Sequence, residues 1–306
     1  MPLLAPALWV RGNVPALTRL MSSIVARDGA LIASQSQLEP LLGIFQHLLA
    51  QKLTESYAFD LLEAIVIHVP TAALQQYWPP IATLLLQRLQ SSKTEMLSAR
   101  FARFYSLVAA RTAAGLGADF FIRVVESIQA DIFTGLYLNV ILKQVPLLRR
   151  NVDRKTAVVG LARTAGDSDA FAVRYKKGWA YTVDAVLSLL ENPPVIQASA
   201  SGGGSQQTNG ASGSAAGTYS DQGSGAGPAA LQDLDAEGAG FGAGFTQLAS
   251  CSRSAEDPFP ETGPDLRRWV GSYFKEADQR HGGRVGGFVG ERLSEQSRQV
   301  LLGYMS

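Results

Sequence analysis

Residues 54–90 read TESYAFDLLEAIVIHVPTAALQQYWPPIATLLLQRLQ, and this stretch holds two apolar segments separated by one proline. In the first segment, residues 61, 62, 65 and 66 are all Leu, Ile or Val, and this spacing places them on one face of a helix. Pro70 ends the segment because a proline disfavours α conformation in the residue before it. Thr71 then offers an N-cap hydroxyl to the next helix. The stretch therefore predicts two helices joined by a tight turn.

The same helical pattern extends outward from this pair, from residue 13 to about residue 192, and strand-like alternation does not persist anywhere in it. The basic pair Arg149 and Arg150 suits a helix C-terminus, and Pro193 and Pro194 stop the last helix of the region. The pattern predicts helices near 14–26, 36–52, 54–69, 71–90, 94–112, 117–130, 132–148, 152–164 and 171–191.

Alternate predicted helices begin near residues 36, 71, 117 and 152, which gives a period of about 35–45 residues. A helix pair repeated at this period is typical of a HEAT-type solenoid, in which each pair buries its apolar faces by stacking on its neighbours. We therefore expect an all-α fold, a HEAT-repeat α-solenoid built as a right-handed superhelical stack of antiparallel helix pairs. Because the units share little sequence, the pattern alone leaves an ordinary all-helical globule open.

A low-complexity stretch interrupts this pattern. Between residues 201 and 230, 21 of 30 residues are Gly, Ser or Ala. Such a segment cannot bury enough apolar surface to offset the entropy lost when the chain becomes ordered. We expect HEAT-like repeats over 9–192, a flexible Gly/Ser/Ala-rich linker or insertion over 193–240, and C-terminal helical repeats over 241–306. Within the last part, helices are predicted near 244–252, 264–280 and 291–304.

The composition argues against several classes of protein. The net charge of +1 does not suit a protein that binds duplex nucleic acid. The apolar runs are broken well short of the ~20 residues that cross a bilayer, and the first ten residues have no basic leader typical of a signal peptide. Cys251 is the only cysteine, so no intrachain disulfide forms, which fits cytosol or nucleus.

Residues for catalysis or metal binding are scarce. His47, His68 and His281 lie far apart and lack metal-ligand spacing, and a lone cysteine gives no zinc site. The glycines between Gly238 and Gly244 do not match a phosphate-binding loop and have no βαβ unit around them. We therefore expect a binding protein, not an enzyme, with no cofactor.

Four basic residues cluster around the turn that precedes the predicted helix 152–164: Arg149, Arg150, Arg154 and Lys155. Arginine binds carboxylates in bidentate geometry, so such a cluster suits an acidic protein partner; the other interpretation is a set of solvated helix ends. The candidate partner-binding residues are Arg88, Lys93, Arg149, Arg150, Arg154 and Lys155.

Several short motifs occur together in one order along the chain. They are GNVPAL (12–17), LLGIFQ (41–46), LQRLQSSKT (86–94), AVVGL (157–161), FTQLA (245–249), GRV (283–285) and LGY (302–304). In this order and spacing the chain resembles the importin-α re-exporters, the cellular apoptosis susceptibility family of the importin-β superfamily. The resemblance runs from about Trp9 to the C-terminus and covers roughly the last third of the family's usual length.

The resemblance implies a HEAT solenoid that binds importin-α together with GTP-bound Ran in the nucleus and returns importin-α to the cytoplasm. The alternatives are a generic helical-repeat scaffold that binds another protein and a truncated copy without transport activity. It implies shuttling between nucleus and cytoplasm with passage through pore complexes of the nuclear envelope, and it leaves contact with nuclear pore proteins open. Cargo and Ran are expected against the inner helices, here the predicted helices near 36–52, 71–90, 117–130 and 152–164.

Two departures from the family pattern concern Ran. The N-terminal repeats that supply the family's main Ran contact are missing, so we expect Ran-GTP binding to be weak or lost. The family also has an acidic insertion near the Gly/Ser-rich stretch, and here only Asp233, Asp235 and Glu237 preserve its acidity. These three residues are the candidate Ran-contacting segment.

Overall fold

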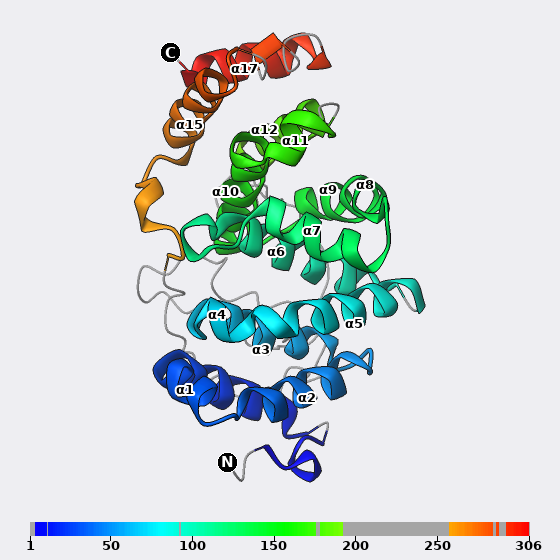
Figure 1. The fold of residues 1–306 in the computed structure, drawn as a ribbon. Coiled ribbons are helices and arrows are strands. Elements are labelled where there is room, and N and C mark those ends of the chain that lie inside the picture. Colours follow the sequence, from blue (N-terminus) through cyan, green and yellow to red (C-terminus); the bar gives the residue numbers. More distant parts are fainter. Residues whose placement is uncertain are drawn as a thin grey trace, which may run out of the picture.

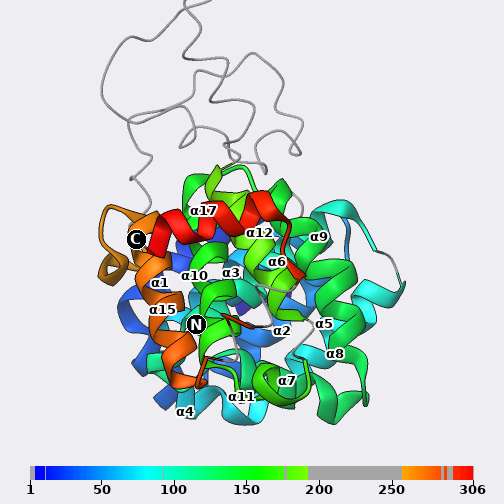
Figure 2. The same ribbon diagram turned by 90° about the horizontal axis from the view of Figure 1, so that it is seen from above.

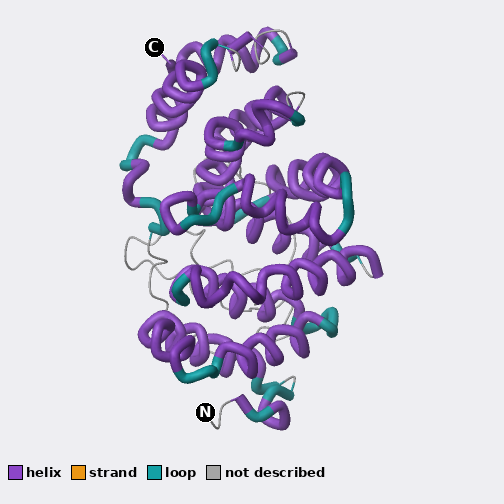
Figure 3. The backbone as a smooth tube through the Cα atoms, viewed as in Figure 1, coloured by secondary structure: helices purple, strands orange, loops and turns teal. Residues whose placement is uncertain are grey.

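The computed structural model describes residues 4–10, 12–91, 93–175, 178–191, 257–283, 286–287 and 292–305. These parts of the chain contain helices and turns and no β-strand (Figure 3). The helices are stacked from the N-terminal to the C-terminal end of the molecule (Figure 1). The chain is an all-α solenoid, as its sequence predicts.

The elements follow the predicted order closely. The helices are α1 (Val14–Ser34), α2 (Leu38–Leu49), α3 (Glu55–His68), α4 (Thr71–Leu74), α5 (Trp78–Ser91), α6 (Glu95–Ala110), α7 (Ala118–Ile128), α8 (Ile132–Leu136), α9 (Leu142–Gln144), α10 (Asn151–Asp167), α11 (Asp169–Val173), α12 (Gly178–Glu191), α15 (Leu266–Arg280) and α17 (Glu295–Met305). One π-helical turn, Tyr137–Ile141, joins α8 to α9.

The helices form two layers. In the first layer α1 packs on α3, α3 on α6, α6 on α10 and α10 on α15. In the second layer α5 packs on α7, α7 on α8, and α12 on α9 and α17. Seen from above, α1 and α15 lie on the opposite side of the molecule from α5 and α8 (Figure 2). Residues from both layers, Phe59, Tyr105, Phe133 and Trp179 among them, form one continuous apolar core.

The predicted alternation of layers is wrong at its last member. Helices α5 and α7 pack on each other as predicted, and α2 packs on α3, but α10, predicted near 152–164 as the equivalent of α5 and α7, packs on α6 in the first layer. The cause is that the chain forms two helices between α6 and α10, namely α7 and the helix from Ile132 to Gln144, and the latter contacts α6, α7 and α12. This additional helix shifts the count by one, so α10 takes the first-layer position.

Other differences concern helix ends. The first helix extends to Ser34 and not to residue 26, but it has a kink near the predicted end, where Asp28 has non-helical backbone angles (φ −126°, ψ 27°). A Cβ at Gly29 would lie 2.4 Å from the carbonyl oxygen of His68, so only glycine allows α1 to approach α3 this closely. The helix predicted over 71–90 is divided by a 3-10 turn, Gln75–Tyr77. The segment predicted over 171–191 forms α11 and α12, and the helix predicted over 244–252 lies outside the described residues.

The contact between α6 and α10 is the most extensive between any two helices of the described chain. A Cβ at Gly160 of α10 would lie 2.2 Å from the carbonyl oxygen of Ser106 of α6. A buried hydrogen bond of 2.9 Å joins the hydroxyls of Tyr105 and Thr164 across the same two helices. Close backbone approach and a paired buried hydroxyl fix this helix pair in one register.

Candidate partner-binding surface

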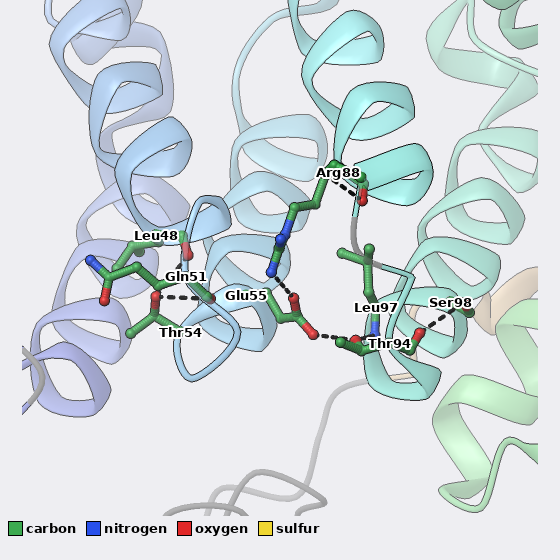
Figure 4. Close-up of polar contacts among 9 residues, drawn as sticks. Leu48, Gln51, Thr54, Glu55, Arg88, Thr94, Leu97 and Ser98 are labelled. Atoms are coloured by element: carbon green, nitrogen blue, oxygen red, sulfur yellow. Dashed lines mark hydrogen bonds and ion pairs between the residues drawn. The ribbon is translucent and has the colours of Figure 1, made fainter.

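Arg88 lies at the C-terminal end of α5 and points into the fold (Figure 4). Its Nη2 donates a 2.9 Å bond to Oε2 of Glu55, a carboxylate buried at the start of α3. The hydroxyl of Thr94 donates to the other oxygen of the same carboxylate. Thr94 also accepts a 2.9 Å bond from the backbone N–H of Leu97 and so caps α6. Arg88 therefore joins α5 to the beginnings of α3 and α6.

Lys93 is exposed in the short connection before α6. It directly precedes Thr94, the N-cap residue of α6. Of the two candidates in this region, Lys93 presents its charge to solvent, while Arg88 is paired with Glu55.

The four basic residues around the start of α10 have different environments. Arg149 is exposed. Nε of Arg150 pairs with Oδ2 of Asp153 at 2.8 Å. Arg154 donates to the backbone carbonyls of Leu148, at 3.4 Å, and Leu189, and burial lowers its pKa. The sequence correctly predicts a basic cluster at a turn between helices, but much of its charge faces the molecule itself.

Lys155 completes this basic cluster on the first turns of α10. Its Nζ pairs with Oδ2 of Asp257 at 2.6 Å. Asp257 comes from a segment 102 residues away in the sequence. The partner-binding role of all six candidates stays a prediction, and Lys93 and Arg149 are the two that the fold leaves exposed.

A buried charge network on the first layer was not anticipated from the sequence. Arg103 of α6 pairs with Glu63 of α3 and, through Nε at 2.6 Å, with Oδ1 of Asp153 of α10. One turn away, Nη1 of Arg100 pairs with Oδ1 of Asp60 at 3.1 Å. The signal in the sequence is spacing, because Asp60/Glu63 and Arg100/Arg103 are opposite charges with the same three-residue interval on alternate predicted helices, 54–69 and 94–112.

Burial affects the two carboxylates of this network differently. Burial raises the pKa of Glu63 to about 7, against the opposing attraction of Arg103. Burial alone would also raise the pKa of Asp153, but the positive charges of Arg103 and Arg150 outweigh it and lower this pKa. The network joins three successive first-layer helices, α3, α6 and α10, so its role is to hold these helices together.

The acidic residues predicted to contact Ran, Asp233, Asp235 and Glu237, lie outside the described residues, and their role stays a prediction. Within the described ranges, no group of three or more His, Cys, Asp or Glu side chains is arranged to hold a metal ion. Among the same residues, no helix combines the length and the apolar character needed to span a bilayer.

The sequence matches a protein-family model over nearly its whole length. The model is "CAS/CSE protein, C-terminus", and it matches residues 1–208 and 219–304. The chain belongs to the CAS/CSE family. It is 32% identical over 279 residues to the importin alpha re-exporter of Saccharomyces cerevisiae, an alignment that covers 90% of this chain and 25% of that protein. It is 30% identical to the importin-alpha re-exporter of Schizosaccharomyces pombe, with coverage of 99% and 29%.

A solved structure of the CAS/CSE family has the same fold. The exportin Cse1 in its cargo-free, cytoplasmic state superposes with a TM-score of 0.71 at 26% identity, over 99% of this chain and 28% of that one. The chain thus spans between a quarter and three-tenths of the length of these CAS/CSE relatives. Both the family and the solenoid architecture agree with the resemblance drawn from the sequence motifs.

Proposed function

We propose that this chain acts as the C-terminal segment of a nuclear export receptor that binds importin-α and helps return it to the cytoplasm. The match to the C-terminal CAS/CSE model over nearly the entire chain carries the proposal. Relatives named importin-alpha re-exporters at 30–32% identity support the choice of cargo. A chain with this role shuttles between nucleus and cytoplasm and passes nuclear pore complexes, where pore proteins are a further class of partner.

In this proposal the receptor performs no chemistry and needs no cofactor; it recognises proteins through its surface. Lys93 and Arg149 are the basic side chains best placed to meet acidic groups of importin-α, because both are exposed. Arg88, Arg150, Arg154 and Lys155 support that surface from within, since each is bonded to a carboxylate or carbonyl of the chain itself.

Ran in its GTP form is the second proposed partner, with weak or no binding to this chain alone. Its contact in this segment is assigned to Asp233, Asp235 and Glu237. The alternative proposal is a helical-repeat scaffold for another protein, which the solenoid fold supports equally well on architecture alone.

The test is a binding titration of the chain against importin-α, alone and with Ran loaded with GTP or GDP. Binding to importin-α that GTP-loaded Ran hardly changes is the expected result. A strong increase with GTP-loaded Ran, absent with the GDP form, would show that the chain also carries a Ran contact. Absence of importin-α binding in all three conditions would contradict the proposal and leave the scaffold alternative.

Charge reversal of the exposed arginine tests the surface. Arg149→Glu should weaken importin-α binding without loss of stability, while Arg19→Glu, on the exposed side of α1, serves as the matched control. Equal binding by both variants would remove the basic turn from the proposed interface.

A further inference from the structure

Residues Asp257–Glu261, here called the clip, lie across the first layer between α6 and α10 before the chain enters α15. The ring of Phe259 is 3% exposed. It packs into a small apolar cluster, separate from the main core, made by Leu107 and Ala110 of α6 and Val159 of α10. The clip therefore attaches by an aromatic side chain inserted between two helices.

Two ion pairs flank this ring. Nζ of Lys155 pairs with Asp257 at 2.6 Å, and Nη2 of Arg163 pairs with Oε1 of Glu261 at 3.0 Å. The guanidinium of Arg163 also lies 6.0 Å from the centroid of the Phe259 ring, within cation–π range. The receiving surface, here called the slot, is thus an apolar site with a cation on either side of it.

Arg163 is held by the body of the fold independently of the clip. Arg163 donates a further bond to the backbone carbonyl of Ala110 at the end of α6, where the helix dipole favours a positive charge. The Lys155 and Arg163 side chains are only 19% and 15% exposed, whereas Asp257 and Glu261 are 45% and 51% exposed. The slot belongs to the body of the fold, and the clip lies on the outside of it.

The clip itself has the properties of a short linear peptide ligand. Pro258 and Pro260 restrict its backbone on either side of the aromatic residue. The backbone N–H of Phe259 donates to Oδ1 of Asp257 at 3.1 Å, and the hydroxyl of Thr262 donates to the carbonyl of Phe259 at 2.9 Å. Such local bonds reduce the ordering cost of docking.

We propose that Leu107, Ala110, Val159, Lys155 and Arg163 form a recognition slot for an acidic peptide with a central aromatic residue, of the form Asp-x-Phe-x-Glu, and that the clip is its resident ligand in cis. A tethered segment has an effective concentration on the order of millimolar, so the clip occupies the slot until a tighter peptide displaces it. The slot then takes an acidic, aromatic motif from another protein. This inference does not depend on importin-α binding.

The experiment uses the full chain and a fluorescent peptide of its own residues 257–263, DPFPETG, followed by fluorescence anisotropy. The unsubstituted chain should bind the peptide weakly because the clip competes. Phe259→Ala releases the clip, and its apparent affinity for the peptide should rise by about tenfold or more. A peptide with alanine at the Phe position should not bind, and added salt should weaken binding of the intact peptide.

The slot is tested separately from the clip. Adding Lys155→Glu and Arg163→Glu to the Phe259→Ala chain should abolish peptide binding. Far-UV circular dichroism checks that the Phe259→Ala chain is folded. If it is not, Asp257→Asn with Glu261→Gln keeps the ring in place while weakening the clip, and the same rise in affinity is expected. A folded, clip-weakened chain that binds the peptide no better than the unsubstituted chain overturns the proposal, as does binding that survives the double charge reversal.

Discussion

The central stack of α3, α6 and α10 and the terminal pair of α15 and α17 are both made of packed helices, but they are joined to their neighbours differently. In the stack, Arg103 sits between two carboxylates whose side chains are 6% and 4% exposed. The terminal pair is joined to α12 by an ion pair between Arg267 and Glu191, and both of these side chains are about half exposed. Buried charges are costly to leave unpaired, while exposed pairs contribute little. The stack should therefore resist opening, and the terminal pair should open first.

The sharpest test of this difference is removal of Arg103. Arg103→Leu leaves Glu63 and Asp153 buried without their shared partner, and we expect the free energy of unfolding to fall by about 3–5 kcal/mol. Urea denaturation followed by circular dichroism measures the change. A loss below about 1 kcal/mol would mean that the buried network behaves like an exposed pair.

The next effect concerns backbone contact between α6 and α10. Gly160→Ala places a Cβ 2.2 Å from the carbonyl of Ser106, so one helix must move and about 2 kcal/mol should be lost. Gly43→Ala is the matched control, because a Cβ there has no atom within 4 Å and alanine favours the helix by about 0.5–1 kcal/mol. Equal effects of the two substitutions, measured by thermal unfolding, would contradict close packing of the stack.

A third test uses pH. The folded-state pKa of Glu63, about 7, lies above its ordinary value of 4.5, so the folded chain holds a proton that the unfolded chain releases between these values. Stability should therefore fall as pH rises through this window, by up to about 1.4 kcal/mol per pH unit. Asp153, with its lowered pKa, loses its stabilising effect only below this window as pH falls.

Glu63→Gln isolates the contribution of this carboxyl. The difference in unfolding free energy between the unsubstituted chain and the variant, measured from pH 5 to pH 7, should change with pH in the direction stated. A difference that stays constant across the window would show that Glu63 is ionised throughout.

The smallest effect is expected at the terminal pair. Arg267→Ala removes an ion pair whose side chains are 56% and 42% exposed, and the free energy of unfolding should change by less than about 1 kcal/mol. Hydrogen exchange should nevertheless be faster at the amides of α15 and α17 than at those of α6 in both chains. Slower exchange in the terminal pair would reverse the comparison.

The sequence predicts the helices well because apolar spacing and prolines are local signals. Layer membership is not local: the helix from Ile132 to Gln144 has the same period as its neighbours, and only its contacts with α6, α7 and α12 show that it is an additional helix between α6 and α10. The same holds for Gly29, whose role as the contact point between α1 and α3 appears only in the folded chain.

The candidate partner-binding residues show the same difference between local and long-range information. A cluster of basic residues at the start of α10 is visible in the sequence, but its partners are not. Asp257 reaches Lys155 from 102 residues away, and Leu189 supplies a carbonyl to Arg154 from 35 residues away. Sequence patterns locate charge, whereas the fold decides whether that charge is available to another protein.

The contact of Gly160 with Ser106 also limits how the solenoid can move. With two backbones touching at one point and no side chain between them, α10 cannot slide along α6 without a collision. Rotation about the point of contact keeps the distance unchanged. We therefore expect any change in curvature at this level of the stack to occur as a rotation of α10 about its contact with α6 at Gly160.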